Sequence, residues 1–154
     1  MQWYTGNTFY DTVLALGFVL AALIALSSMF GTAKYGGRFG SKGGGFKMGS
    51  KAGWILMEFP GLLVFPVVYF TGRNAMEPVP LFFLAVWMVH YSNRALINPL
   101  LMRVQPGTRS SFDFSVVIAG WVTLTIHGYL NAAYISELGT YYVPSWFSDP
   151  RFLL

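Results

Sequence analysis

The stretch Ala52–Pro60, AGWILMEFP, decides the fold because it places one ionisable side chain, Glu58, inside a long apolar run. The run continues as GLLVFPVVYF to Phe70, and at about 1.5 Å per helical residue it crosses most of a hydrocarbon layer of about 30 Å. A charge at that depth costs about 3 kcal/mol on insertion scales, so an intramembrane acid ordinarily faces a cavity, a partner or a substrate. We therefore expect Glu58 to lie inside a membrane helix, either at a functional site or in an ion pair that holds two helices together.

Pro60 follows the acid by two positions. Proline has no backbone N–H, so the carbonyl of Leu56 loses its helical donor and the helix is expected to kink beside Glu58. The sequence thus predicts a freed backbone carbonyl close to the carboxylate.

The composition is that of a membrane protein. Of 154 residues, 55% are hydrophobic and only 10% are charged, against about one quarter charged in soluble domains. The absence of cysteine excludes disulfides and thiolate chemistry. The net charge of +4 comes largely from one loop between apolar runs, which membrane orientation explains without a nucleic-acid partner.

The pattern of apolar runs predicts an all-α integral membrane protein, a multi-pass helical bundle that forms a single domain over 1–154. A further helix is expected to start at about 150, where Asp149 suits the N-cap and Pro150 the first helical position. Since that helix has no room to span, we expect the chain to be the front part of a longer protein. The four expected spans are about 8–30, 52–70, 79–101 and 112–136.

The basic loop 31–51 predicts the orientation, because positively charged loops stay on the cytoplasmic side. We expect this loop in the cytoplasm and the N-terminus outside or in the lumen, in a bacterial inner membrane or the endoplasmic reticulum. The loop is rich in glycine but lacks a phosphate-binding string, so a flexible basic linker is the favoured interpretation. Its basic residues are Lys34, Arg38, Lys42, Lys47 and Lys51.

The expected span 79–101 carries Tyr91, Arg94 and Asn98 at i, i+3 and i+7, which places them on one helix face. Counted from the cytoplasmic ends at about 1.5 Å per residue, Arg94 lies about 13 Å deep and Glu58 about 10 Å deep. We therefore predict that these two side chains pair, with the Tyr91 phenol one turn further in. A carboxyl, a phenol and a guanidinium polarise a carbonyl when an acidic proton is held against it.

Two histidines, His90 and His127, lie near mid-membrane on successive spans and leave an alternative open. Facing histidines can ligate a haem in a helical bundle, which would make the chain a haem-carrying membrane anchor. Membrane histidines also form hydrogen bonds between helices, and Asn131, four residues after His127, would suit such a polar seam. A non-catalytic membrane subunit is the third possibility. Trp54, one turn from Glu58, is a candidate for lining an apolar pocket.

Three strings in this order and spacing resemble the front half of the steroid 5α-reductases: AGWILMEFP, HYSNRALINPLLMR at 90–103 and WFSDPRF at 146–152. Tyr35-Gly36 and the spacing of His127 and Asn131 resemble further family positions. That family has seven membrane helices and uses NADPH to reduce the C4=C5 double bond of 3-oxo-4-ene steroids. The resemblance implies that most NADPH contacts lie in a C-terminal half of the same protein, so residues 1–154 alone are expected to be inactive.

The resemblance also implies roles for individual residues, with no metal among them. Met57 and Asn131 stand where the family commonly has glutamine, which leaves open a related membrane reductase of sterols, polyprenols or other enone lipids. Membrane lipids and the lipid substrate are the expected partners. The implied catalytic pair is Glu58 and Tyr91, the implied substrate-binding residues are Trp54, Tyr35 and Asn131, and the implied cofactor-binding residues are Arg94, Asn98 and Arg103.

Overall fold

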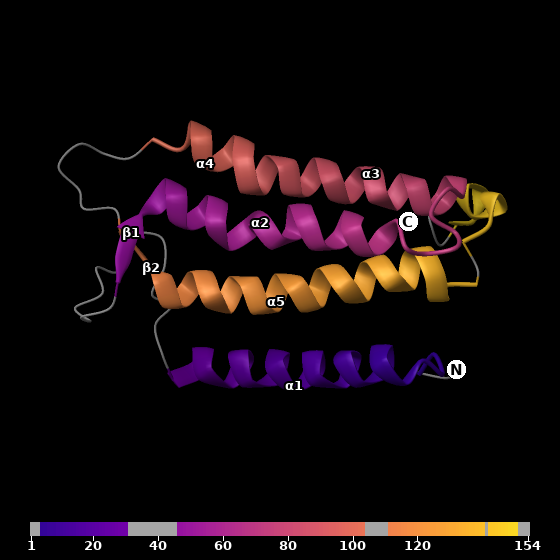
Figure 1. The fold of residues 1–154 in the computed structure, drawn as a ribbon, viewed down its shortest axis with the longest axis horizontal. Coiled ribbons are helices and arrows are strands. Elements are labelled where there is room, and N and C mark those ends of the chain that lie inside the picture. Colours follow the sequence, from indigo (N-terminus) through magenta and orange to yellow (C-terminus); the bar gives the residue numbers. More distant parts are fainter. Residues whose placement is uncertain (1–3, 31–45, 104–110, 141, 151–154) are drawn as a thin grey trace.

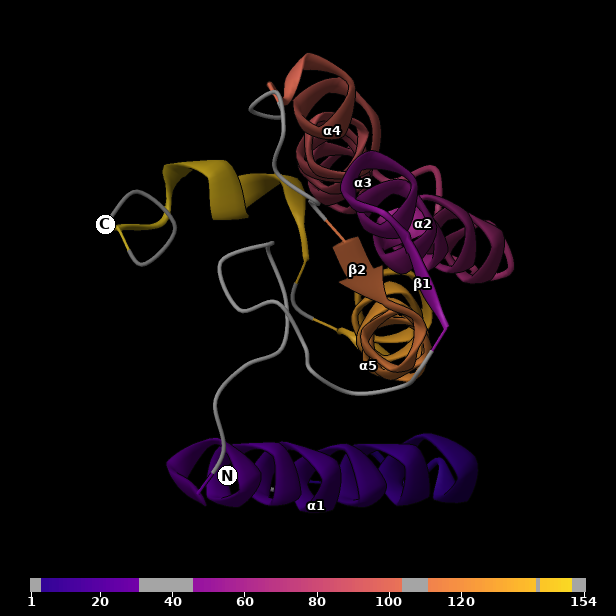
Figure 2. The same cartoon turned by 90° about the vertical axis from the view of Figure 1, so that its left-hand side faces the viewer.

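The computed structural model describes residues 4–30, 46–103, 111–140 and 142–150. Within these ranges the chain forms four helical rods, each running opposite to the one before it (Figure 1). This is the antiparallel alternation expected from the sequence. The second rod lies between the third and the fourth, whereas the first crosses the fourth obliquely (Figure 2). The rods are α1 (Thr8–Phe30), α2 (Ser50–Tyr69), a third rod that begins with α3 (Pro78–Ser92), and α5 (Phe114–Ala133).

Three helices in the described part of the chain are long and apolar enough to cross a membrane, in the segments Thr8–Ser27, Ser50–Tyr69 and Phe114–Leu138. They match three of the four expected spans, and α1 has the bounds predicted for the first. The all-α membrane fold class is confirmed at this level.

The expected span 79–101 is not one uninterrupted α-helix. After α3 the chain continues as a π-helical turn, η1 (Asn93–Ile97), and then as α4 (Asn98–Leu101). The change comes just before Pro99, which cannot donate a helical hydrogen bond, and the backbone N–H of Asn98 instead donates to the carbonyl of Asn93, five residues back. The third expected span is therefore interrupted in its α-helical hydrogen bonding, although the rod is continuous.

Two short strands also depart from the all-α expectation. β1 (Lys47–Gly49) pairs antiparallel with β2 (Ser111–Asp113), Lys47 lying opposite Asp113, at the end of the molecule where α2 and α5 begin (Figure 1). Each strand has three residues, too few for an alternating pattern to be visible in the sequence. Of the predicted flexible loop 31–51, residues 31–45 lie outside the described residues.

The opposite end of the molecule is held by contacts between the α2–α3 turn and η2 (Tyr134–Leu138), a π-helical extension of α5. Arg73 pairs with Glu137 at 3.1 Å, and the backbone N–H of Asn74 donates to the carbonyl of Ser136 at 2.8 Å. The chain then forms the 3₁₀ helix η3 (Pro144–Ser148). Asp149 has the extended backbone of an N-cap and Pro150 is helical, while the rest of the expected fifth helix lies outside the described residues.

Within the described residues, the helices that pack most closely are α2 and α5. A Cβ on Gly120 would overlap Met57, and a Cβ on Gly128 would touch the backbone of Phe65 at 3.4 Å. The glycine at position 120 lets the two helices approach, which is how membrane helices associate in the absence of a hydrophobic driving force. Helix α1 lies on the α5 side of the bundle, apart from α2 and α3 (Figure 2).

Candidate functional site

The pair predicted from matching depth is present. Arg94 Nη2 lies 2.8 Å from Glu58 Oε1, and the side chain of Glu58 is only 2% exposed while that of Arg94 is 46% exposed. The second carboxylate oxygen, Oε2, is buried and has no hydrogen-bond partner among the described residues. A buried acceptor without a partner costs about 1–3 kcal/mol, so the carboxyl group is held in place by one oxygen and left unsatisfied at the other.

A cavity of about 420 Å³ opens beside this pair. Glu58 and Trp54 reach it from α2, Tyr91 from the last turn of α3, and Arg94 from η1, and the Arg94 guanidinium lies 5.6 Å from the centre of the Trp54 ring. The cavity therefore joins one carboxyl, one phenol and one guanidinium to an otherwise largely apolar wall. Its other lining residues are Ile24, Met57, His90, Val116, Ala119, Gly120, Thr123 and Leu124.

Tyr91 is 5% exposed and is enclosed by three neighbours. Its ring stacks on Trp87 at 4.6 Å between centroids and meets His90 edge-on at 5.0 Å, while Gly61 lies directly against the ring. Among the described residues its hydroxyl group has no hydrogen-bond partner. The phenol is thus fixed by its ring and keeps its hydroxyl available to a ligand.

The carbonyl freed by Pro60 has a donor that the sequence analysis did not identify. The indole N–H of Trp121, on α5, donates to the carbonyl of Leu56. The part of α2 around Pro60 is therefore tied to α5 within one turn of Glu58. Nothing in the residue pattern around Trp121 distinguished it from a lipid-facing aromatic residue.

The two histidines lie together at a second cavity, of about 410 Å³, which Tyr91 also lines. The predicted polar seam is not made by Asn131, because its side-chain amide donates to the carbonyl of His127 in its own helix at 2.8 Å. Asn131 does line this second cavity, so the structure places it near Tyr91 but not beside Glu58. The other lining residues are Phe83, Val86, Trp87, Tyr134, Ile135 and Tyr142.

Only one of the predicted cofactor-binding residues reaches the Glu58 cavity. Arg94 does so, whereas Asn98 and Arg103 are exposed towards the end of the molecule that holds β1 and β2. Asn98 is separated from Tyr91 by the π turn, which changes the rotation per residue, and it does not line the Glu58 cavity. That Tyr91, Arg94 and Asn98 share one face stays a prediction. Tyr35 lies outside the described residues.

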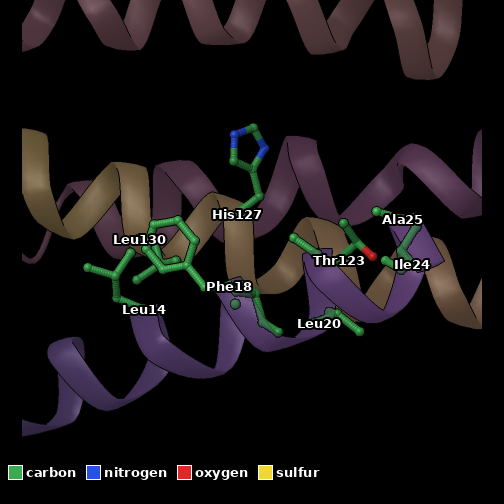
Figure 3. A pocket seen from close by; sticks show the side chains of 11 residues that line it. Leu14, Phe18, Leu20, Ile24, Ala25, Thr123, His127 and Leu130 are labelled. Atoms are coloured by element: carbon green, nitrogen blue, oxygen red, sulfur yellow. The ribbon is translucent and has the colours of Figure 1, made fainter.

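A third cavity, of about 480 Å³, lies between α1 and α5 (Figure 3). Aliphatic and aromatic side chains of α1, among them Leu14 and Phe18, form one wall. Thr123, His127 and Leu130 line it from α5, although the His127 ring points away from α1 (Figure 3). Ile24 and Thr123 line both this cavity and the one beside Glu58, so the two adjoin. The apolar pattern of α1 gave no sign of this groove.

These features define a class: a helical membrane protein whose bundle encloses a half-satisfied carboxyl and a buried phenol in an apolar cavity. No protein-family model matches the chain. Among curated proteins, it is 32% identical to 3-oxo-5-alpha-steroid 4-dehydrogenase 1 of Bos taurus over 154 residues, which covers 91% of this chain and 58% of that protein. It is 25% identical to steroid 5-alpha-reductase DET2 of Solanum lycopersicum, over 84% of this chain and 50% of that protein.

The 3-oxo-5-alpha-steroid 4-dehydrogenase 1 of Homo sapiens is 31% identical over 68% of this chain and 39% of that protein. The chain belongs to the steroid 5α-reductase family, as the resemblance of its motifs indicated. It spans about half the length of the curated relatives it matches. These relatives do not favour the haem-anchor alternative that His90 and His127 left open.

Proposed function

We propose that this chain carries the carbonyl-binding part of a steroid 5α-reductase site, which reduces the C4=C5 double bond of 3-oxo-4-ene steroids with NADPH. The observation that carries the proposal is the state of Glu58, which is 2% exposed, paired with Arg94 through Oε1 and without a partner at Oε2. Tyr91, on the same cavity, offers a phenol that is also free of hydrogen bonds among the described residues. A ligand carbonyl oxygen between the two would accept a hydrogen bond from the phenol and, when Oε2 carries a proton, from the carboxyl group.

The 3-keto oxygen of the substrate accepts hydrogen bonds, so the site must supply donors. The Tyr91 hydroxyl is one donor. The Glu58 carboxyl becomes the second when Oε2 carries a proton, while Oε1 stays with the Arg94 guanidinium, which fixes the orientation of the group. Donors fixed before the substrate arrives stabilise the oxygen most when it gains charge, because they need not reorganise during the reaction.

Bound NADPH supplies the hydride that adds to C5. The two π electrons of the C4=C5 bond then form a C3=C4 double bond, and the carbonyl electrons move onto the 3-oxygen as an enolate. Tyr91 and Glu58 donate to that oxygen as its charge develops. When the enolate collapses and C4 takes up a proton derived from water, the products are the saturated 3-ketone and oxidised nicotinamide.

Some of the described residues could bind part of a dinucleotide. Arg94 is half exposed at the edge of the Glu58 cavity, and Asn98 and Arg103 are exposed further along the same rod. A guanidinium binds phosphate oxygens in a bidentate fashion, and an amide can donate to the same groups. We propose that these three residues contact NADPH and that a C-terminal half of the protein supplies the remaining contacts.

The cavity also suits the substrate class. Its volume of about 420 Å³ falls within the range of about 300–1,000 Å³ typical of small-molecule sites, and its wall is largely apolar. Met57, 9% exposed, lies on this wall next to Glu58, so the substrate meets a flexible thioether there. We propose that the substrate is a 3-oxo-4-ene steroid that enters the cavity from the membrane lipids. We also propose that the basic 31–51 loop is cytoplasmic and that the N-terminus lies outside or in the lumen.

The test is the kinetics of Tyr91→Phe in the full-length protein reconstituted into lipid nanodiscs. Removing one donor to a developing oxyanion typically costs a factor of about 10² to 10³ in kcat, so we expect a loss of that size on a 3-oxo-4-ene steroid with folding intact. Tyr10→Phe is the control, since Tyr10 is equally buried but packs between α1 and α5 against Tyr129 and Tyr134. An unchanged kcat for Tyr91→Phe, or turnover of a sterol or polyprenol enone but no steroid, would contradict the proposal.

A further inference from the structure

A column of stacked aromatic rings leads from the far end of α2 to the Glu58 cavity. Tyr69 stacks on Phe65 at 5.9 Å, Phe65 on Trp87 at 4.1 Å and Trp87 on Tyr91 at 4.6 Å, with angles of 14°, 16° and 29° between the ring planes. Tyr69 and Phe65 are fully buried, and the Tyr69 hydroxyl donates to the carbonyl of Ala75 at 2.7 Å. The column is therefore anchored at one end and finishes at the phenol that the proposed function needs.

Gly61 closes the other side of the last ring. A Cβ at this position would overlap the Tyr91 ring, coming within 2.9 Å of its Cγ, so only glycine lets α2 approach Tyr91 this closely. The carbonyl of Gly61 also accepts a hydrogen bond of 2.8 Å from the indole N–H of Trp87. One backbone unit of α2 thus supports Tyr91 directly and fixes the ring that stacks on it.

We infer that Trp87 and Gly61 are positioning residues that hold the Tyr91 ring with its hydroxyl at the Glu58 cavity. This inference rests on the proposed role of Tyr91. Tyr91 also lines the second cavity, which contains His90 and His127, so the space into which its ring would turn is present. The stack and the glycine are the contacts that oppose this rotation, and a displacement of about 1 Å at a reacting group can cost about 10²-fold in rate.

A purely structural role, in which the column only packs α2 against α3, makes a different prediction. Loss of packing lowers the amount of folded protein but leaves kcat per folded molecule unchanged. Loss of positioning lowers kcat itself, and only while Tyr91 has a hydroxyl to misplace. A double-mutant cycle between positions 87 and 91 separates the two roles.

The experiment measures kcat and KM per folded molecule for the full-length protein in nanodiscs. We expect Trp87→Leu, which removes the stack, to lower kcat by about 10- to 100-fold and to change KM by less than about 3-fold. Trp87→Phe keeps a ring but loses the donor to Gly61, so we expect a loss of only a few fold. Gly61→Ala, whose Cβ overlaps the Tyr91 ring, is the second test variant. Gly128→Ala is its control, because a Cβ at position 128 meets nothing closer than 3.4 Å.

In the Tyr91→Phe background, we expect Trp87→Leu to cause no further loss of kcat. A loss of equal size in both backgrounds, or a normal kcat for Trp87→Leu, would overturn the inference. A second readout does not depend on activity: 3-fluorotyrosine at position 91 should show a changed ¹⁹F shift in Trp87→Leu and Gly61→Ala but not in Gly128→Ala. Unchanged shifts in both test variants would refute positioning, whereas changed shifts with an active Tyr91→Phe enzyme would refute only the proposed function.

Discussion

Helices α1 and α2 offer spanning segments of the same length, 20 residues each, yet they are used differently. The segment in α1 is the more hydrophobic, with a mean hydropathy of 2.2 against 1.6, but only 6% of its most apolar window is buried, compared with 39% in α2. What α2 has and α1 lacks is an acid in mid-helix, two prolines and a glycine that a Cβ would drive into a neighbouring ring, because the acid of α1, Asp11, lies in its first turn. Small and polar residues therefore determine which helix is buried in the bundle. An apolar helix surface gains little from burial, because lipid tails contact it as favourably as a neighbouring helix does.

The largest expected effect on stability is at the Glu58 pair. Arg94→Leu leaves a carboxylate that is 2% exposed without its partner, and removing one member of a buried pair costs about 3–5 kcal/mol. Because Arg94 is half exposed, we expect about 2–3 kcal/mol, measured by unfolding of the purified protein in mixed micelles. The double variant Arg94→Leu with Glu58→Gln should recover most of the loss. Equal stability of Arg94→Leu and wild type would show that this contact does not hold α2 in the bundle.

A smaller effect is expected at the hydrogen bond between Trp121 and Leu56. Trp121→Phe removes the donor to the carbonyl that Pro60 leaves free, and hydrogen bonds between membrane helices contribute about 1 kcal/mol. In a Pro60→Ala background the backbone N–H of residue 60 can bond that carbonyl, so the same Trp121→Phe change should then cost less. If the cost is equal in both backgrounds, the indole is not compensating for the proline.

The smallest effect is expected in α1. Phe18 is 69% exposed on the groove that α1 forms with α5, and lipid can replace the contacts of its ring. We expect Phe18→Ala to change stability by less than about 0.5 kcal/mol, whereas Phe65→Ala, the same substitution at a fully buried position of α2, should cost about 3 kcal/mol or more. Similar losses at both positions would mean that α1 is held in the bundle as firmly as α2.

Length and depth were predictable from the sequence because helix geometry converts residue number directly into distance. The bounds of α1, the approximate bounds of α2 and the pairing of Glu58 with Arg94 all follow from a rise of about 1.5 Å per residue and the position of the basic loop. These quantities need no knowledge of how one helix is turned against another.

Rotation and partner choice were not predictable. The helices are apolar on all sides, so no hydrophobic stripe indicates which side of each helix faces the bundle. For that reason Trp87 and Trp121 could not be told from lipid-facing aromatics. The π turn and the two strands depend on local hydrogen bonds that periodicity does not record.

The small sheet of β1 and β2 fixes the position of α2 along α5. Helices α2 and α5 start directly after the paired strands and run in the same direction. Contacts between these helices, and between the segments that follow them, keep a nearly constant separation along the chain: 65 residues between Leu56 and Trp121, and 64 between Arg73 and Glu137. A residue inserted in the first turn of α2 would advance the rest of α2 by about 1.5 Å and turn it by about 100°, which would move every one of these contacts out of phase. Changes of chain length before Lys47 would leave the phase intact, so the chain tolerates length variation on one side of the strand and not on the other.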